Sequence, residues 1–167
     1  MTVRVRRAVT ADREFILGLV PRLRAFGPSP LRPLDALDGA ERRALDKALA
    51  TGTPDSAVFV AELDNGGLAG VAHAETAVDY FTGERHGHLA VLAVDEGNEG
   101  KGVGRALMTA TEMWAATNGY RLLTLNVFAA NARARSVYER AGFEPDFVRY
   151  VKELTPALPA DRPAPTR

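Results

Sequence analysis

The amino-acid sequence predicts an α/β fold, in the form of an α+β sandwich with helices on both faces of a mixed central sheet. Strand-like alternation opens the chain, three consecutive strand patterns fill its middle, and helical periodicity lies on either side of these strands. Because strands and helices in this order bury their apolar faces against each other, we expect two helical layers around one sheet.

The N-terminal segment predicts a strand and a helix. Residues 3–6 alternate as a strand does, and the apolar side chains between positions 15 and 23 recur at helical spacing. Thr10 is a candidate N-cap for this helix. Pro21 should kink or interrupt the helix, because proline lacks the amide proton that an interior turn requires.

The next segment predicts a loop followed by a second helix. Three prolines and a glycine over residues 27–33 argue against regular structure there. We expect the helix to begin near Asp38, with Glu41 placed as in a capping box.

The middle of the chain predicts an antiparallel meander of three strands. Residues 58–61 and 68–78 have strand patterns and are joined by a turn over residues 64–67, which gives a hairpin. After a second turn at residues 82–85, the apolar run over residues 88–94 is typical of a central strand that is buried on both faces.

The remainder predicts alternating helices and strands, and then a tail. In order, we expect a helix from Val103 to Gly119, a strand over 121–127, a helix over 131–141 that Gly142 and Phe143 cap, and one or two strand segments over 147–154. Residues 1–155 are expected to form a single domain. Residues 156–167 contain four prolines and few large apolar side chains, which predicts a disordered tail.

A glycine-rich loop lies between the expected central strand and the helix after it. The strand ends as Leu92-Ala93-Val94, and the chain then reaches the start of the helix as Glu99-Gly100-Lys101-Gly102-Val103-Gly104-Arg105. Backbone amides without neighbouring β-carbons can close on an anion, and a helix N-terminus attracts negative charge, so this loop is suited to phosphate or pyrophosphate. Tight packing alone is the alternative reason for these glycines. The dinucleotide-binding and P-loop patterns both fit this spacing less well.

A second motif follows, in which a strand over Leu123-Thr124-Leu125-Asn126-Val127 precedes Asn131, Ala134, Tyr138 and Gly142-Phe143. Together the two motifs resemble the GNAT superfamily of acetyltransferases, whose signatures are a strand, Arg/Gln-x-x-Gly-x-Gly/Ala and a helix, then a strand and Asn-x-x-Ala-x-x-x-Tyr-x-x-x-Gly-Phe. The specific part covers residues 89–143. Glu99 departs from the pattern, since a carboxylate near a pyrophosphate is unfavourable unless its side chain points to solvent.

The resemblance implies a coenzyme site where two parallel strands of the central sheet splay apart. The pantetheine arm of acetyl-CoA, the co-substrate, would lie between these strands. The residues so implied are Leu92, Ala93 and Val94 through their backbone, Gly100, Lys101, Gly102, Val103, Gly104 and Arg105 around the pyrophosphate, and Asn131 at the coenzyme arm. Taken singly, these residues also fit roles in the core, at the solvated surface or in helix capping.

The resemblance also implies direct transfer of an acetyl group to an amine of a small molecule or a protein. It assigns the proton donor for the departing thiolate to Tyr138. Some relatives place a glutamate base where this chain has Asn126, which cannot accept a proton. His88 is one candidate base, since it shares a face with Leu92 in a regular strand. Glu75 and water are the others.

Composition restricts the alternatives. The chain has no cysteine, which excludes a disulfide framework, a thiolate nucleophile and a zinc site built on sulfur, and we expect no metal. The 21 basic and 21 acidic side chains balance, so net charge gives no reason to expect nucleic acid or an anionic membrane as partner. The sequence shows neither a secretory pattern nor an apolar run that could span a bilayer, and we expect a cytoplasmic protein. A homodimer is left open.

Two other functions compete with the acetyltransferase. A non-catalytic acyl-CoA-binding module would agree with Glu99 and Asn126, whereas Tyr138 argues against it. A nucleotide-dependent phosphotransferase would need an acidic magnesium cluster and a P-loop serine, and neither pattern is found in the sequence.

Overall fold

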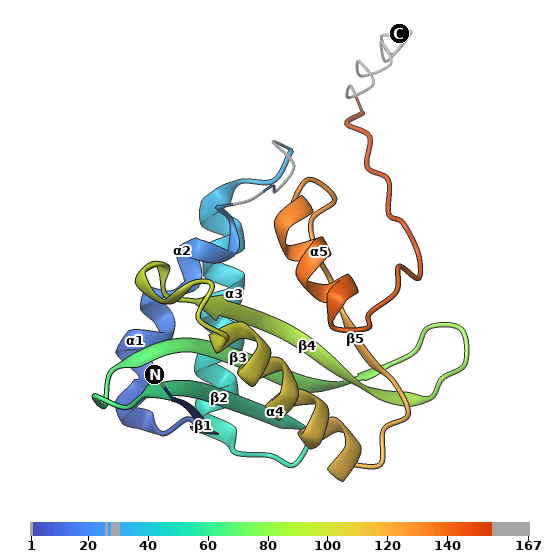
Figure 1. The fold of residues 1–167 in the computed structure, drawn as a ribbon. Helices are drawn as coiled ribbons and strands as arrows, with labels where there is room; N and C mark the ends of the chain where they lie inside the picture. The colour runs from blue at the N-terminus through green and yellow to red at the C-terminus, as the bar shows by residue number, and fades with distance from the viewer. Residues whose placement is uncertain (1, 26, 28–30, 155–167) are drawn as a thin grey trace, which may run out of the picture.

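The computed structural model describes residues 2–25, 27 and 31–154, and within them a mixed sheet lies between two helical layers (Figure 1). The strands stand in chain order, with the first four antiparallel and β5 parallel to β4. They are β1 (Val3–Arg7), β2 (Ser56–Leu63), β3 (Leu68–Val78), β4 (Arg85–Val94) and β5 (Leu123–Leu125). The predicted fold class is confirmed, although β4 begins before His88 and β5 is shorter than expected.

Each face of the sheet is covered by its own set of helices. Figure 1 shows α4 in front of the sheet and α3 behind it. Behind the sheet, Ile16, Val20 and Leu45 are fully buried against apolar side chains of β2, β3 and β4. In front, a second core cluster joins Leu107 and Trp114 of α4 to the opposite face. The helices are η1 (Thr10–Asp12), α1 (Arg13–Gly18), α2 (Val20–Leu23), α3 (Leu34–Thr51), η2 (Glu96–Asn98), α4 (Val103–Thr117) and α5 (Ala132–Arg140).

The first helical segment is interrupted, as Pro21 predicts. Helix α1 ends at Gly18, and α2 restarts at Val20 with the proline in its first turn, where no amide proton is needed. The expectation that Thr10 is the N-cap is wrong, because Thr10 lies inside the 3-10 turn η1. The amide of Val9 instead donates to the Asp12 carboxylate at 2.8 Å.

Asp12 is a buried carboxylate that ties this turn to the sheet. Its two oxygens accept from the Arg6 guanidinium at 2.7 and 2.9 Å, and these bonds with Arg6 lower the pKa of Asp12 despite the opposing effect of burial. A carboxyl group whose pKa is lower in the folded state than in the unfolded state stabilises the fold. This stabilisation is fully present above the unfolded-state pKa and is lost as the pH falls through the folded-state pKa. The contribution is therefore expected to persist at neutral pH and to decrease progressively as the pH falls below about 4.

We expect Asp12→Ala to lower the free energy of unfolding by about 2–3 kcal/mol at neutral pH, because it leaves a half-buried guanidinium and an amide without this acceptor. Urea unfolding from pH 7 to pH 3 should show the difference from wild type shrinking in the acid range. Asp46→Ala is the control, since Asp46 pairs with Arg13 at an exposed site and should cost at most about 1 kcal/mol. Equal losses in the two variants would contradict this role for Asp12.

The start of α3 differs from the expectation. The helix begins at Leu34 after Pro33, so Asp38 and Glu41 lie inside it and form no capping box at its start. The physical reason is that proline with its fixed φ is well suited to the start of a helix, which competes with the capping signal further along. Asp38 instead accepts from the Arg24 guanidinium at 2.8 Å.

The strand expected over residues 147–154 is absent, since these residues are irregular and exposed. Its apolar residues come in adjacent pairs, Phe147-Val148 and Tyr150-Val151, so a strand could not bury them on one face. The helix end before it agrees with the prediction, with Gly142 at φ +92° and the amide of Phe143 donating to the carbonyl of Tyr138 at 3.0 Å. The tail over residues 156–167 lies outside the described residues.

Candidate active site

The sheet opens between β4 and β5. The two strands pair only over Gly87–Leu89 and Leu123–Leu125, whereas β4 continues to Val94. The β3–β4 register also skips Ala90, which makes it a bulge, and a bulge bends the strand that carries it. Within the described residues, β4 therefore has no strand partner on its β5 side from Ala90 onward. The peptide groups of Leu92, Ala93 and Val94 lie in this open stretch.

The glycine loop lies at the end of the open stretch. Gly100 and Gly102 have φ of +72° and +83°, and a β-carbon at either would meet nothing within 4 Å. Helix α4 begins directly after Gly102 without a side-chain cap. Among the described residues, the amides of Val103, Gly104 and Arg105 have no acceptor, because the first backbone bond is from Ala106 to the Gly102 carbonyl. These amides can bind an anion.

Lys101 turns back onto its own loop. Its ammonium group donates to the Gly97 carbonyl at 2.6 Å and lies 3.3 Å from the Asn98 amide oxygen. The side chain therefore stabilises the turn before the glycines, and only its backbone belongs to the open loop.

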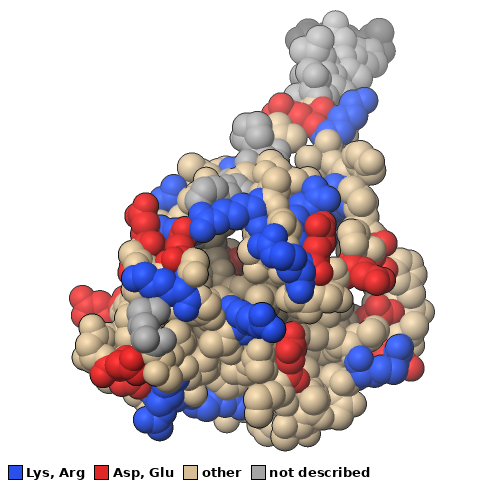
Figure 2. Space-filling view, in the orientation of Figure 1, with Lys and Arg blue, Asp and Glu red and all other residues tan. Residues whose placement is uncertain are grey.

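Glu99 does not point to solvent. Its side chain is 27% exposed and lies between two guanidinium groups, Arg22 of α2 and Arg133 of α5. The hydrogen bond from Arg133 and then that from Arg22 lower the pKa of Glu99, which keeps the carboxylate charged. Figure 2 shows a hollow on this face between the positions of α2 and α5 in Figure 1, with basic side chains at its rim.

Helix α5 borders the open side of β4. The Asn131 side chain caps the helix by accepting from the Ala134 amide at 3.0 Å, so its capping role is observed. Tyr138 is half-buried against the core cluster under α4, with its ring 6.0 Å from that of Phe143. Burial raises the pKa of Tyr138, so the phenol stays protonated at neutral pH.

A row of polar side chains crosses the face of the sheet that points away from α4. Ser56, Glu75, His88 and Thr124 are successive Cα partners on β2, β3, β4 and β5. The expectation that His88 shares a face with Leu92 is wrong, because the bulge at Ala90 shifts the alternation. A β-carbon at Gly87 would point at Trp114 and Ala115 of α4, so the adjacent His88 points away from α4.

His88 lies in a polar but partly desolvated setting. Its Nδ1 lies 2.8 Å from the Thr124 hydroxyl, which also lies 3.1 Å from Nε2 of His86. Burial lowers the pKa of His88, although the charge of Glu75 acts in the opposite direction. Burial and the charge of Glu75 raise the pKa of Glu41 on α3, which places a second carboxyl group near the row. A neutral imidazole beside acidic groups can accept a proton from a cationic amine.

The splayed strands, the open amides and the capped helix occur in the order of the two sequence motifs. The model of the Acetyltransferase (GNAT) family matches residues 26–143. The chain belongs to the GNAT family. It is therefore an acyltransferase, as the sequence predicts.

Several other proteins resemble this chain over most or part of its length. The uncharacterised N-acetyltransferase YhfO of Bacillus subtilis (strain 168) is 33% identical over 148 residues, 87% of this chain and 94% of YhfO. Streptothricin acetyltransferase of Streptomyces lavendulae is 38% identical over 89 residues, 53% of this chain and 45% of that enzyme. The fold also matches AAC(6')-Iy in complex with a bisubstrate analogue, CoA-S-monomethyl-acetylneamine, with TM-score 0.70 and 23% identity over 93% of this chain and 100% of the other.

The GNAT motifs give only part of this site. The structure brings the end of β4, the glycine loop and α5 together at the opening between β4 and β5. His88 and Glu75 lie on the face of the sheet that points away from α4. Sequence reasoning missed Arg22 and Arg133, which are far from Glu99 in the chain and carry no motif signal. It also missed Thr124 as the partner of His88, although the parallel pairing of their strands was implied.

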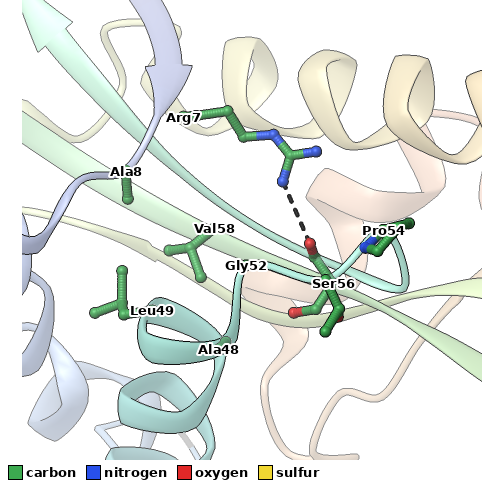
Figure 3. A pocket seen from close by; sticks show the side chains of 9 residues that line it. Arg7, Ala8, Ala48, Leu49, Gly52, Pro54, Ser56 and Val58 are labelled. Atoms are coloured by element: carbon green, nitrogen blue, oxygen red, sulfur yellow. Dashed lines mark hydrogen bonds between the residues drawn. The ribbon is translucent and has the colours of Figure 1, made fainter.

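A separate pocket of about 380 Å³ lies between β1, β2 and the end of α3 (Figure 3). Arg7 is the one charged side chain among its described lining residues; it donates to the Ser56 carbonyl at 3.3 Å and lies over the Phe59 ring. Ser56 is the only residue that this pocket shares with the polar row, and none of the glycine loop lines it.

Two kinds of feature are missing from residues 2–25, 27 and 31–154. These residues contain no group of three or more His, Asp or Glu side chains that could hold a metal ion. None of their helices is both long and apolar enough to cross a membrane.

Proposed function

We propose that this GNAT chain transfers the acetyl group of acetyl-CoA directly to an amine. The observation that carries the proposal is the opening between β4 and β5, which ends at the open amides of Val103, Gly104 and Arg105. An opening lined by strand backbone suits the amide-containing pantetheine arm, and amides at a helix start suit a pyrophosphate. The backbone of Leu92–Val94 would bind the arm, and Gly100–Arg105 would bind the pyrophosphate.

The two candidate proton-transfer groups lie on different sides of the β4–β5 junction. His88 lies on the face away from α4, whereas Tyr138 packs beside the core under α4. In the proposed reaction the amine nitrogen bonds to the thioester carbon and the carbon–sulfur bond breaks. A cationic amine loses two protons in all: His88 accepts one, directly or through water, Tyr138 donates its own proton to the departing sulfur, and the second amine proton restores the Tyr138 phenol through solvent. Each group thus acts on its own side of the reacting carbon.

The polar row favours a cationic small-molecule amine as acceptor. The charge of Glu75 acts on His88, and a protonated amine is attracted to such a site before it loses its proton. The names of two similar proteins agree with a small acceptor, since one acts on streptothricin and the other is bound to an acetylneamine analogue. Asn131 would contact the coenzyme arm with the part of its amide that does not cap α5.

A screen of amines for thiol release from acetyl-CoA tests this function. We expect one or more polycationic small molecules to give turnover well above buffer, with initial-rate patterns of a sequential mechanism and no acetylated protein intermediate. Calorimetry with acetyl-CoA and with ATP should show binding of the first alone. Acetyl-CoA binding without thiol release for any amine would favour the alternative, a non-catalytic acyl-CoA-binding module.

His88 predicts a pH dependence for this reaction. A base must be neutral, and a lowered pKa keeps the His88 imidazole neutral below its usual value of about 6.5. The acid limb of kcat/KM that belongs to His88 should therefore lie below that pH. We expect His88→Gln to remove this limb and to lower kcat/KM roughly tenfold, because water can carry the proton in its place. A variant with an unchanged pH profile would exclude His88 as the base.

A further inference from the structure

The Arg22–Glu99–Arg133 bridge joins the two sides of the hollow at the coenzyme end of the site. Each oxygen of the Glu99 carboxylate pairs with a different arginine, Oε1 with Arg22 and Oε2 with Arg133 at 2.7 Å. Arg22 belongs to α2 and Arg133 to α5, two helices that lie apart in Figure 1. One carboxylate thus holds two guanidinium groups that come from separate elements.

This arrangement is typical of an anion site rather than of an ordinary surface ion pair. Two guanidinium groups directed at neighbouring oxygens match a phosphate as well as a carboxylate, since both anions accept charge-assisted bonds from arginine. Glu99 also directly precedes the loop whose amides have no acceptor within the described residues. The bound carboxylate and an anion held by the loop would therefore share one small region.

We infer that Glu99 occupies, in the free protein, the two guanidinium groups that bind the coenzyme pyrophosphate in the complex. The inference rests on the proposed function, because it needs acetyl-CoA at the glycine loop. When the coenzyme binds, Arg22 and Arg133 exchange the carboxylate for phosphate oxygens. Glu99 then lies beside a second anion without its partners. Glu99 therefore opposes coenzyme binding, while the two arginines promote it.

The inference predicts opposite effects for the two members of one ion pair. Glu99→Gln removes the competing charge, and we expect the dissociation constant for acetyl-CoA to fall about tenfold, the size expected for two partly exposed charge contacts. Arg133→Gln removes a phosphate contact, and we expect the dissociation constant to rise about tenfold. The measurement is isothermal titration calorimetry of the full chain with acetyl-CoA.

Two control variants separate this effect from a general change in charge. Glu96→Gln alters the same loop by the same charge, but Glu96 is 87% exposed and only reaches Arg22 at 3.5 Å. Arg135→Gln alters α5 two residues after Arg133, where the guanidinium donates to the Ala129 carbonyl at 3.4 Å and forms no ion pair with a described residue. Both controls should bind acetyl-CoA within about twofold of wild type.

Thermal unfolding without coenzyme gives the second readout. Glu99→Gln should lower the melting temperature, since it breaks the bridge, and yet bind acetyl-CoA more tightly. A bridge with a structural role alone predicts losses of both stability and affinity, and that result would overturn the inference.

Unchanged affinity in Glu99→Gln, or affinity no higher than in Glu96→Gln, would overturn it as well. If Glu99→Gln did not fold, the Arg133→Gln variant, whose side chain is exposed, would provide the test. Unchanged affinity of that variant for acetyl-CoA would also overturn the inference. Wild-type protein that binds no acetyl-CoA would instead refute the proposed function itself.

Discussion

Replacing Gly104 with valine is expected to weaken acetyl-CoA binding by about 10²-fold or more. Gly104 is in the first turn of α4, where its amide and those of Val103 and Arg105 have no acceptor among the described residues. A branched side chain in this turn holds a pyrophosphate away from the amides, and each charge-assisted bond that is lost costs about 1.5–3 kcal/mol. Calorimetric titration of the variant with acetyl-CoA measures the loss.

The Gly104 variant should remain folded. A β-carbon at this position would lie 3.6 Å from the Val94 side chain, which is an ordinary contact. Gly18→Val is the matched control, because Gly18 is also helical and has open space around it, but it lies in α1 behind the sheet. A folded Gly104→Val protein with wild-type affinity would show that the pyrophosphate does not bind at this loop.

Replacing Tyr138 with phenylalanine is expected to lower kcat by about 10²-fold and to leave acetyl-CoA affinity unchanged. The variant keeps the ring that packs near Phe143 and removes only the hydroxyl that would protonate the departing sulfur. Loss of a general acid typically costs roughly 10²- to 10⁴-fold, and a thiolate is a good leaving group, so the low end applies. Because burial raises the pKa of Tyr138, any basic limb due to this phenol should lie above about pH 10.

Tyr120→Phe distinguishes a proton donor from a structural tyrosine. The Tyr120 hydroxyl lies 2.6 Å from the Thr76 hydroxyl, on the same side of the sheet as Trp114. Its removal should cost about 1 kcal/mol of stability and leave kcat unchanged. Equal kcat values for wild type and Tyr138→Phe, measured where chemistry limits turnover, would return Tyr138 to a packing role.

Local patterns predict most of the fold. Helical and strand periodicity identify the hairpin of β2 and β3 and the helix α4, because their apolar residues face one continuous core. The errors arise where local signals compete. Pro33 starts α3 ahead of the capping signal at Asp38, and the adjacent apolar pairs after Phe143 suit a strand by composition but not by alternation.

The motifs predict the candidate site only where it is local in sequence. The glycine loop and α5 each occupy one short segment, so their spacing shows in the sequence. The environment of Glu99 depends on Arg22 and Arg133, and that of His88 on Thr124 and on a one-residue bulge. Such features depend on tertiary register, which no local pattern records. Most of the new information in the structure therefore concerns contacts between residues that are far apart in the sequence.

Acetyl transfer with a labelled acetyl group tests the central claim most directly. The purified protein is incubated with acetyl-CoA labelled in the acetyl carbons and with the best acceptor from the amine screen, and mass spectrometry quantifies both products. We predict labelled N-acetyl amine and free coenzyme A in equal amounts, with neither formed when the protein is left out. Bound acetyl-CoA that yields no labelled amine, or labelled amine without an equal amount of free coenzyme A, would contradict direct transfer by this protein.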